Sequence, residues 1–193
     1  MWLQLRRGRY RRADDQPRRS LGLSWLVIPA ATLGGTIAGF GPGWLAVPAW
    51  VYLIGASAVA WIDIDVHRVP DRLLLLWVPA VLAALLVAAA MTSWSILLWS
   101  AAGAISLGLL FLVLALVGSM GLGDVKLAAT TGLVVGLFGW PGLVTAVVVA
   151  FVAAAVVAVV LLIRGVSRHS HLAFGPAIIV GAAVAVLRAG LGL

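Results

Sequence analysis

Long hydrophobic segments separated by short polar gaps make up nearly the whole chain after its first 20 residues. Most are close to the roughly 20 residues with which an α-helix crosses a hydrocarbon core. We therefore predict an all-α fold, a polytopic membrane helical bundle of about seven (six to seven) transmembrane helices. The fifth segment is short for a full span, so it would be tilted in a thinned site or shielded by its neighbours. The expected helices cover approximately residues 23–41, 45–62, 73–91, 95–117, 126–139, 142–163 and 173–192.

Composition agrees with a membrane protein. Hydrophobic residues make up 64% of the chain and charged residues only 10%, with a mean hydropathy of +1.17. These values lie far outside the range of soluble domains. The chain has no cysteine, and all six of its acidic residues are aspartates. A disulfide framework and a Cys-built zinc site are therefore excluded, and we expect no metal and no other cofactor.

Positive charge is concentrated at the N-terminus, where seven arginines fall within the first 19 residues, directly before a hydrophobic segment. Such residues hold their flank of a span in the cytoplasm and contact anionic lipid. We predict a basic cytoplasmic arm over residues 1–20 and a membrane domain over residues 21–193. Lipid is the expected partner of the arm, and no nucleic-acid partner is expected. The first hydrophobic segment is too long for the core of a cleaved secretory signal.

Threading the spans from a cytoplasmic N-terminus places three polar loops on the side of the arm, at about residues 63–72, 118–126 and 164–171. All basic residues except Arg188 then lie on the cytoplasmic side, as the positive-inside bias requires. The opposite connections are short and uncharged, and each carries a tryptophan of the kind that anchors at the membrane interface.

Four of the six aspartates lie in two of these cytoplasmic loops, about 60 residues apart along the chain. An ionisable group beside hydrocarbon is expensive and indicates a functional site, and two carboxylates suggest shared proton chemistry. Asp63 ends the second hydrophobic segment. Asp124 follows three glycines, of which Gly121 and Gly123 are the nearest, and these permit backbone conformations and close approaches that a side chain would block.

The remaining polar residues of the two loops are expected to support the site. Pro70 restricts the backbone, so the first loop should be tightly shaped. Asp71 is well placed to cap the following helix, and Asp65 is either a partner of Asp63 or solvated. Lys126 could favour the ionised form of Asp124, stabilise developing negative charge, or extend to lipid phosphate.

Three stretches resemble the prepilin leader peptidases of type IV pilus and related secretion systems, membrane aspartyl proteases of the Gly-x-Gly-Asp class. The resemblance implies that Asp63 and Asp124 form the catalytic pair, without a metal. It also implies a prepilin or pseudopilin substrate, whose short basic leader is cut at the cytoplasmic face of the bacterial inner membrane. The stretches are Trp-Ile-Asp-Ile-Asp-Val-His-Arg-Val-Pro-Asp at 61–71, Gly-Ser-Met-Gly-Leu-Gly-Asp-Val-Lys-Leu at 118–127 and Phe-Gly-Pro at 174–176.

The chain departs from the larger members of that family, which carry a zinc-binding N-terminal domain with two Cys pairs that is associated with methylation of the new pilin N-terminus. It resembles the short, peptidase-only members, so methyltransferase activity is not expected. The proposed chemistry is physically coherent, because two neighbouring carboxylates do not both ionise cheaply and one can hold a proton while the other activates water.

Other functions stay open from the residues alone. An intramembrane protease that resembles the presenilin and signal-peptide-peptidase group would place its first aspartate in a Tyr-Asp pair, whereas Ile62 precedes Asp63 here. A transporter with a carboxylate relay would hold its acids at mid-membrane among broken helices. A metal-dependent transferase could use Asp63 and Asp65 as ligands, but the other groups that such a site requires are sparse. The sequence also leaves open whether the protein forms a homo-oligomer.

Overall fold

Helices occupy every predicted hydrophobic segment that the structure, a computed structural model, describes. It describes residues 43–66, 71–118, 121–164 and 174–193, so the basic arm and the segment predicted at 23–41 lie outside the described residues. No strand occurs in these ranges. The elements are α3 (Ala46–Val66), α4 (Asp71–Met91), α5 (Ser95–Val117), α6 (Leu122–Val135), the 3-10 turn η2 (Gly136–Phe138), α7 (Gly139–Ile163) and α8 (Gly175–Gly190).

Several of these helices match a bilayer in length and composition. Within the described residues, four stretches are long and apolar enough to cross a membrane, and Gly175–Gly190 is a shorter apolar helix. The prediction of a multi-helix membrane protein is confirmed to this extent. The total of seven spans and the cytoplasmic N-terminus stay predictions. The four stretches are Ala46–Asp63, Leu73–Met91, Ser95–Val117 and Leu122–Ile163.

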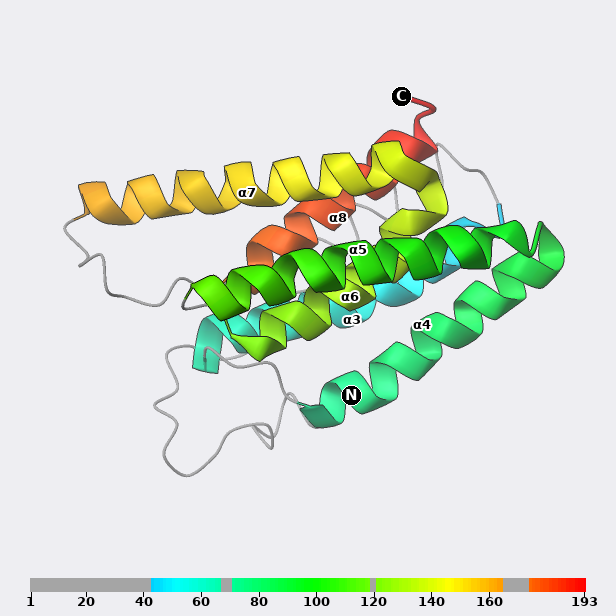
Figure 1. Ribbon diagram of the computed structural model, residues 1–193, viewed down its shortest axis with the longest axis horizontal. Helices are drawn as coiled ribbons and strands as arrows, with labels where there is room; N and C mark the ends of the chain where they lie inside the picture. The colour runs from blue at the N-terminus through cyan, green and yellow to red at the C-terminus, as the bar shows by residue number, and fades with distance from the viewer. Residues whose placement is uncertain (1–42, 67–70, 119–120, 165–173) are drawn as a thin grey trace.

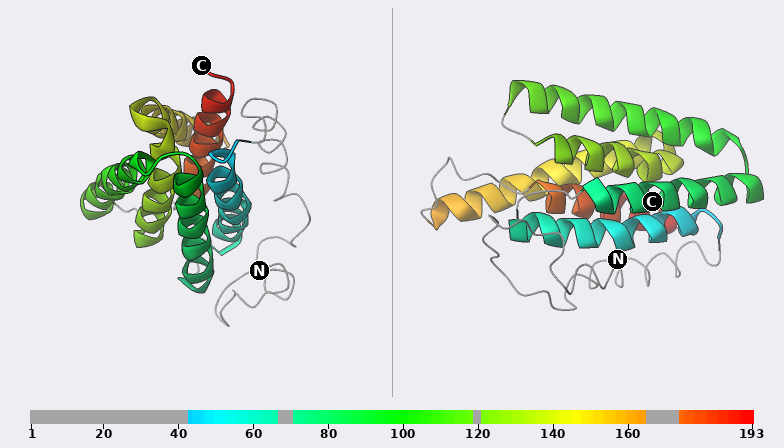
Figure 2. Two further views of the ribbon diagram at one scale, coloured as in Figure 1. Left: turned by 90° about the vertical axis from the view of Figure 1, so that its right-hand side faces the viewer. Right: turned by 90° about the horizontal axis from the view of Figure 1, so that it is seen from below.

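The fourth stretch does not run straight, because α6 and α7 point in opposite directions (Figures 1 and 2). The reversal follows η2, where Gly139 has a φ of 64°, in the left-handed region that glycine adopts without strain. With 14 residues, α6 rises only about 21 Å, less than the roughly 30 Å of a hydrocarbon core. The expected shortness of this segment is thus present in the structure.

Successive helices alternate in direction along the bundle, as both figures show. The C-terminal ends of α3, α5 and α7 and the N-terminal ends of α4, α6 and α8 therefore lie together. We call this the polar end, because the three polar loops of the predicted threading begin and end here. The connection from α4 to α5, the turn at η2 and the start of α3 lie at the opposite end (Figure 1).

Helix α6 lies within the bundle and packs closely on α5 along one side. A Cβ atom on Gly132 would collide with the carbonyl oxygen of Gly103, and a Cβ atom on Gly103 would collide with that of Gly132. On the side of α3, the hydroxyls of Tyr52 and Thr131 form a buried hydrogen bond of 2.6 Å. Thr131 also donates to the carbonyl oxygen of Leu127 at 2.9 Å. These contacts hold the helix that carries Asp124.

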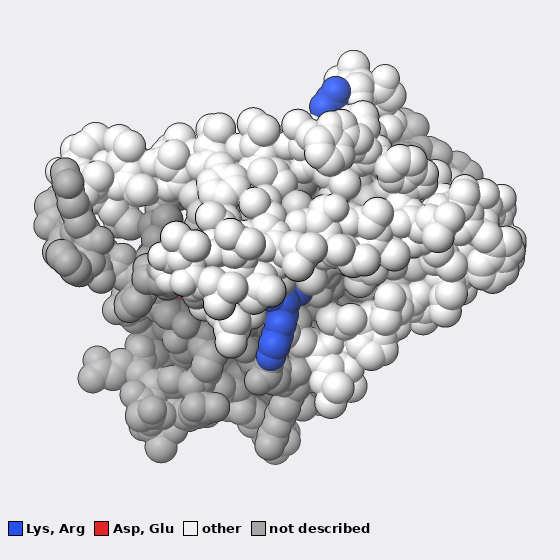
Figure 3. Space-filling model, viewed as in Figure 1, with Lys and Arg blue, Asp and Glu red and all other residues white. Residues whose placement is uncertain are grey.

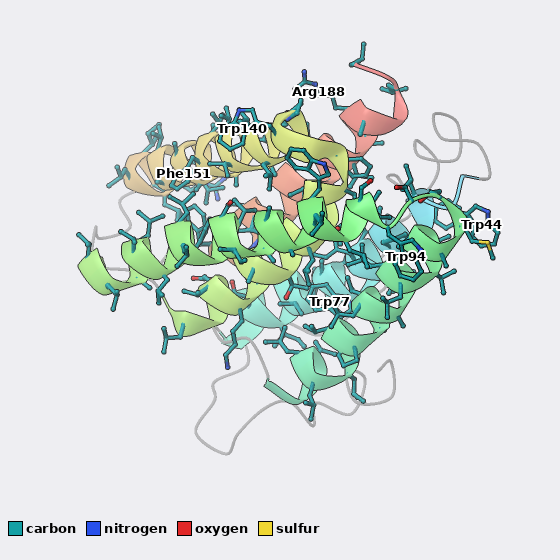
Figure 4. The ribbon with its side chains drawn as sticks, turned by 45° about the vertical axis from the view of Figure 1, so that its right-hand side comes forward. Trp44, Trp77, Trp94, Trp140, Phe151 and Arg188 are labelled. Carbon is teal, nitrogen blue, oxygen red and sulfur yellow. The ribbon has the colours of Figure 1, made fainter. Side chains whose placement is uncertain are left out.

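The outer surface of the described helices is largely apolar, as a protein surrounded by lipid requires. Figure 3 shows a face over α5 and α7 that is almost entirely uncharged, with basic side chains at only two places. Three exposed tryptophans occupy the end opposite the polar end, at the start of α3, α5 and α7: Trp44, Trp94 and Trp140 (Figure 4). Their position suits the interface role predicted for them.

Candidate active site at the polar end

Asp63 lies inside α3, because this helix continues to Val66 instead of ending near residue 62 as predicted. Its side chain is only 5% exposed. The Oδ2 atom has no hydrogen-bond partner among the described residues. A buried polar atom without a partner is costly, so this carboxylate is not explained by a structural role. It is the last residue of the candidate span Ala46–Asp63.

The start of α8 faces the Asp63 carboxylate. The backbone amide of Gly175, the first residue of α8, donates a hydrogen bond toward it. The approach is so close that a Cβ atom on Gly175 would lie 2.7 Å from Asp63 Oδ2. Pro176 follows in the first turn, where its missing N–H leaves no helix hydrogen bond unmade. The positive end of the helix dipole is therefore directed at a buried carboxylate.

Asp124 is the third residue of α6, so it stands in the first turn of a helix and not in the loop where the sequence suggested it would be. Its side chain is half-buried. The carboxylate accepts a hydrogen bond from the backbone of Gly121, and the Asp124 N–H donates to the Gly121 carbonyl oxygen at 3.0 Å. The bond from the Asp124 side chain to the backbone of the N-cap residue Gly121 is one half of a capping box, and glycine has no side chain to supply the other half.

Asp63 and Asp124 come together in the fold despite their separation in sequence. Their carboxylates are close enough for the two charges to interact. The start of α8 lies against both helices, because a Cβ atom on Gly175 would contact the Asp63 carboxylate and also the side chain of Leu127, one turn along α6 from Asp124. A negative charge on one of two such carboxylates disfavours ionisation of the other.

The other residues predicted to support the site have different outcomes. Gly121 has φ −75° and ψ 146°, an ordinary extended conformation, so backbone freedom is not the reason for glycine at this position. It is exposed, which leaves its backbone open to an approaching chain. Gly123 is the second residue of α6, and Lys126 is exposed on the same helix.

The remaining predicted residues belong to the loop after α3. Asp65 is in the last turn of α3 and Asp71 is the first residue of α4, at the helix start where a capping residue was predicted. The side chains of both, and Pro70 altogether, lie outside the described residues. Their supporting roles therefore stay predictions.

An aromatic cluster beside the site was not foreseen. The ring of Phe174 packs edge-on against Phe111 of α5 and Phe151 of α7, with centroid distances of 5.7 and 5.5 Å. Phe111 and Phe151 are 6.2 Å apart, and Figure 4 shows Phe151 on α7. Phe174 belongs to the Phe-Gly-Pro stretch that the sequence singled out, but nothing in the spacing of the other two rings indicated that they meet it.

The charged groups of the described residues do not assemble a recognisable metal centre. No group of three or more His, Cys, Asp or Glu side chains lies together in the part of the chain that the structure describes. Among the described residues, the site contains two carboxylates and the backbone amides at two helix starts.

Comparison with known proteins adds a family to this geometry. A model of the type IV leader peptidase family matches residues 50–163, more than half of the chain, and this range contains both Asp63 and Asp124. It ends before Phe174 and Gly175, so the contribution of α8 to the site lies beyond the matched range. No match was found among curated proteins or among solved structures.

Proposed function

The chain belongs to the type IV leader peptidase family, and on that premise we propose that it is a membrane-embedded aspartyl endopeptidase that removes the short basic leader of type IV prepilin-like proteins. Family membership supports peptidase activity. The observation that carries the aspartyl mechanism is the pair formed by the buried Asp63 and the half-buried Asp124, whose charges interact. Prepilins or pseudopilins are the proposed substrates.

The proposed reaction uses the two carboxylates in alternating roles. The ionised member takes a proton from water while the oxygen of that water attacks the scissile carbonyl carbon. The protonated member donates to the carbonyl oxygen, and a tetrahedral intermediate forms. When this intermediate collapses, the C–N bond breaks and the leaving nitrogen receives the proton that the first carboxylate took up. As the carbon–oxygen double bond re-forms, a hydroxyl of the intermediate returns a proton to the second carboxylate. The pair then carries one proton again, so the site is ready for another cycle.

Two helix starts favour this chemistry. Asp124 is in the first turn of α6, and the start of α8 lies against Asp63. A helix N-terminus carries partial positive charge that stabilises nearby negative charge. Backbone N–H groups fixed in a site of low dielectric need no reorganisation as charge develops. The exposed, extended backbone at Gly121 offers a place where a substrate chain can approach Asp124.

The polar end is the proposed cytoplasmic face. Among the described residues it carries Lys126 and Arg164, and the adjoining segments 67–70 and 165–173 contain further basic residues. At the other end, Arg188 stands in the last turn of α8, where Figure 4 labels it. This distribution follows the positive-inside bias. The proposed active site would then be accessible to the substrate's leader on the cytoplasmic side.

The proposal is tested by offering the purified protein two matched substrates in detergent. One is a prepilin-like protein with a short basic leader before its hydrophobic helix, and the other is the same protein without the leader. We expect the first to lose its leader, the second to stay intact, and the new N-terminus to be unmethylated, as mass spectrometry would show. Cleavage inside the hydrophobic helix would instead indicate an intramembrane protease, and a panel of uncut prepilins would contradict the proposal.

A further inference from the structure

We propose that Gly175 is the positioning residue for Asp63: the absence of a side chain at this position lets the start of α8 lie against the carboxylate and fix its orientation toward Asp124. The contact itself is a property of the fold. Its consequence for catalysis rests on the proposed function. Gly175 lies outside the range matched by the family, so nothing in that match assigns it a role.

The first argument is steric. A Cβ atom on Gly175 would lie 2.7 Å from Asp63 Oδ2 and 3.3 Å from Asp63 Cγ, both shorter than an ordinary contact. The Asp63 side chain is 5% exposed, and its neighbours Ile62 and Leu127 are fully buried. Well-packed interiors accommodate an added carbon only by displacement. The atom that would have to move is therefore the proposed catalytic carboxylate.

The second argument is that the start of α8 is itself held in place. The ring of Phe174 is packed between Phe111 and Phe151. Its carbonyl oxygen accepts hydrogen bonds from the N–H groups of Ala177 at 3.0 Å and Ile178 at 3.2 Å. Because α5 and α7 together fix Phe174, the amide of the next residue has a defined position. Asp63 is thus oriented by a rigid group on one side.

Orientation matters because Asp63 has few other constraints. Its Oδ2 atom has no hydrogen-bond partner among the described residues, and the backbone amide of Gly175 donates toward the carboxylate. A misplacement of about 1 Å in a catalytic group can cost roughly a hundredfold in rate. A substitution at Gly175 should therefore act on kcat, whereas one that only loosens α8 should act on stability.

A thermal-stability cycle tests the contact without relying on catalysis. Tm is measured in detergent for Gly175→Ala in the natural background and in an Asp63→Ala background, with Gly181→Ala as the matched control. Gly181 is also buried on α8, about 9 Å further along, and its Cβ would collide with the Ala146 carbonyl oxygen of α7. Sites that far apart have additive effects.

In the natural background we expect Gly175→Ala to lower Tm by several degrees. In the Asp63→Ala background the loss should be less than half as large, because the smaller side chain at position 63 leaves space for the added methyl group. A Gly175→Ala protein that folds only in the Asp63→Ala background is the extreme form of the same result. Gly181→Ala should lower Tm equally in both backgrounds. An equal loss for Gly175→Ala in both, including failure to fold in both, would overturn the proposal.

Leader cleavage supplies the second readout. We expect Gly175→Ala to lower kcat about 10- to 100-fold with KM unchanged, and the folded fraction of Gly181→Ala to keep the natural kcat. A natural kcat for folded Gly175→Ala would overturn the positioning role. If the unaltered protein cleaves no prepilin, the proposed function fails instead, while the Tm cycle still decides whether Gly175 and Asp63 are coupled.

Discussion

The Asp63 carboxylate is nearly removed from solvent, yet it keeps an oxygen without a hydrogen-bond partner in the described residues. Such a group lowers the stability of the folded state, because its desolvation is not repaid by bonding. Active sites commonly retain residues of this kind, at a cost in stability that function requires. Asp63 is therefore a position where activity and stability should respond in opposite directions.

Asp63→Asn tests that opposition. The amide has nearly the same shape but no negative charge, so the free energy of unfolding should stay equal or rise, by about 1 kcal/mol, while leader cleavage is lost. Thermal unfolding in detergent measures the first quantity. Thr131→Val serves as the contrast, because it removes a buried hydrogen bond with Tyr52 and should lower Tm. A Tm for Asp63→Asn well below that of the unaltered protein would contradict this account of the site.

Gly121 is predicted to tolerate a side chain in the fold but not in the complex with substrate. Its φ of −75° is accessible to alanine, and a Cβ atom there would meet nothing nearer than 3.9 Å. Gly121→Ala should therefore change the free energy of unfolding by less than about 0.5 kcal/mol. Because the exposed backbone is proposed to receive the substrate chain, any loss of activity should appear as a higher KM. A lowered Tm would show that this reading of Gly121 is mistaken.

The two catalytic candidates could be found from sequence because acids are rare beside hydrocarbon, and because their motifs resemble those of a known family. The contact that orients Asp63 could be anticipated only in part. Gly175 belongs to the Phe-Gly-Pro stretch that the sequence singled out, but Phe111 and Phe151 are apolar residues in apolar helices, and only the packing of α5, α7 and α8 brings them to the site. Hydropathy indicates which residues are removed from water, but it does not indicate which of them contact one another.

Helix boundaries near the site show a second limit of sequence reasoning. Aspartate and glycine are weak helix formers, so the polar gaps suggested loops at both aspartates. The structure extends α3 to Val66 and starts α6 at Leu122. For α6 the reason is local, because Asp124 bonds back to the backbone of Gly121 and caps the helix that contains it. Both carboxylates are consequently carried by helices, which hold them more rigidly than loops would.

The close packing of α5 on α6 determines where Asp124 stands. We predict that Gly132→Ala lowers the free energy of unfolding by about 1 to 3 kcal/mol, the usual result of overpacking, because its Cβ would collide with the Gly103 backbone. Gly108→Ala is the matched control on the same interface. Its Cβ would lie 3.3 Å from that of Ala129, a contact that a small shift relieves.

Thermal unfolding of the two variants in the same detergent decides the matter. A larger Tm loss for Gly132→Ala than for Gly108→Ala is the expected order. Equal losses, or the reverse order, would mean that the α5–α6 interface is not as tight as the glycine contacts indicate. Leader cleavage by the folded Gly132→Ala protein should also fall, since α6 carries one of the two proposed catalytic groups.

The bundle as a whole has a polar end with both aspartates and an opposite end with exposed tryptophans. Its long apolar helices could be predicted from hydropathy alone, because in lipid a segment must satisfy its own backbone hydrogen bonds, as a helix does. The turn between α6 and α7 could be predicted as well, because the sequence separates the segments expected at 126–139 and 142–163, although Leu122–Ile163 qualifies by hydropathy as one apolar stretch. The positive-inside bias of the charged residues predicts which end faces the cytoplasm. This prediction can be tested directly.

The orientation can be tested by labelling, because the chain has no cysteine of its own. Single substitutions Arg164→Cys at the polar end and Trp94→Cys at the other end provide one exposed thiol each. In right-side-out vesicles we expect an impermeant maleimide to label only Trp94→Cys, and in inverted vesicles only Arg164→Cys. The opposite pattern would place the proposed active site on the outer face.

The most direct measurement for the central claim is leader cleavage by three isosteric variants beside the unaltered protein. Asp63→Asn and Asp124→Asn should each lower the rate by about a thousandfold or more, since removal of either member disables a unit that acts together. Asp65→Asn, which changes the neighbouring aspartate of the same motif, should retain most of the activity. Cleavage at the natural rate by either Asp63→Asn or Asp124→Asn would contradict the aspartyl pair.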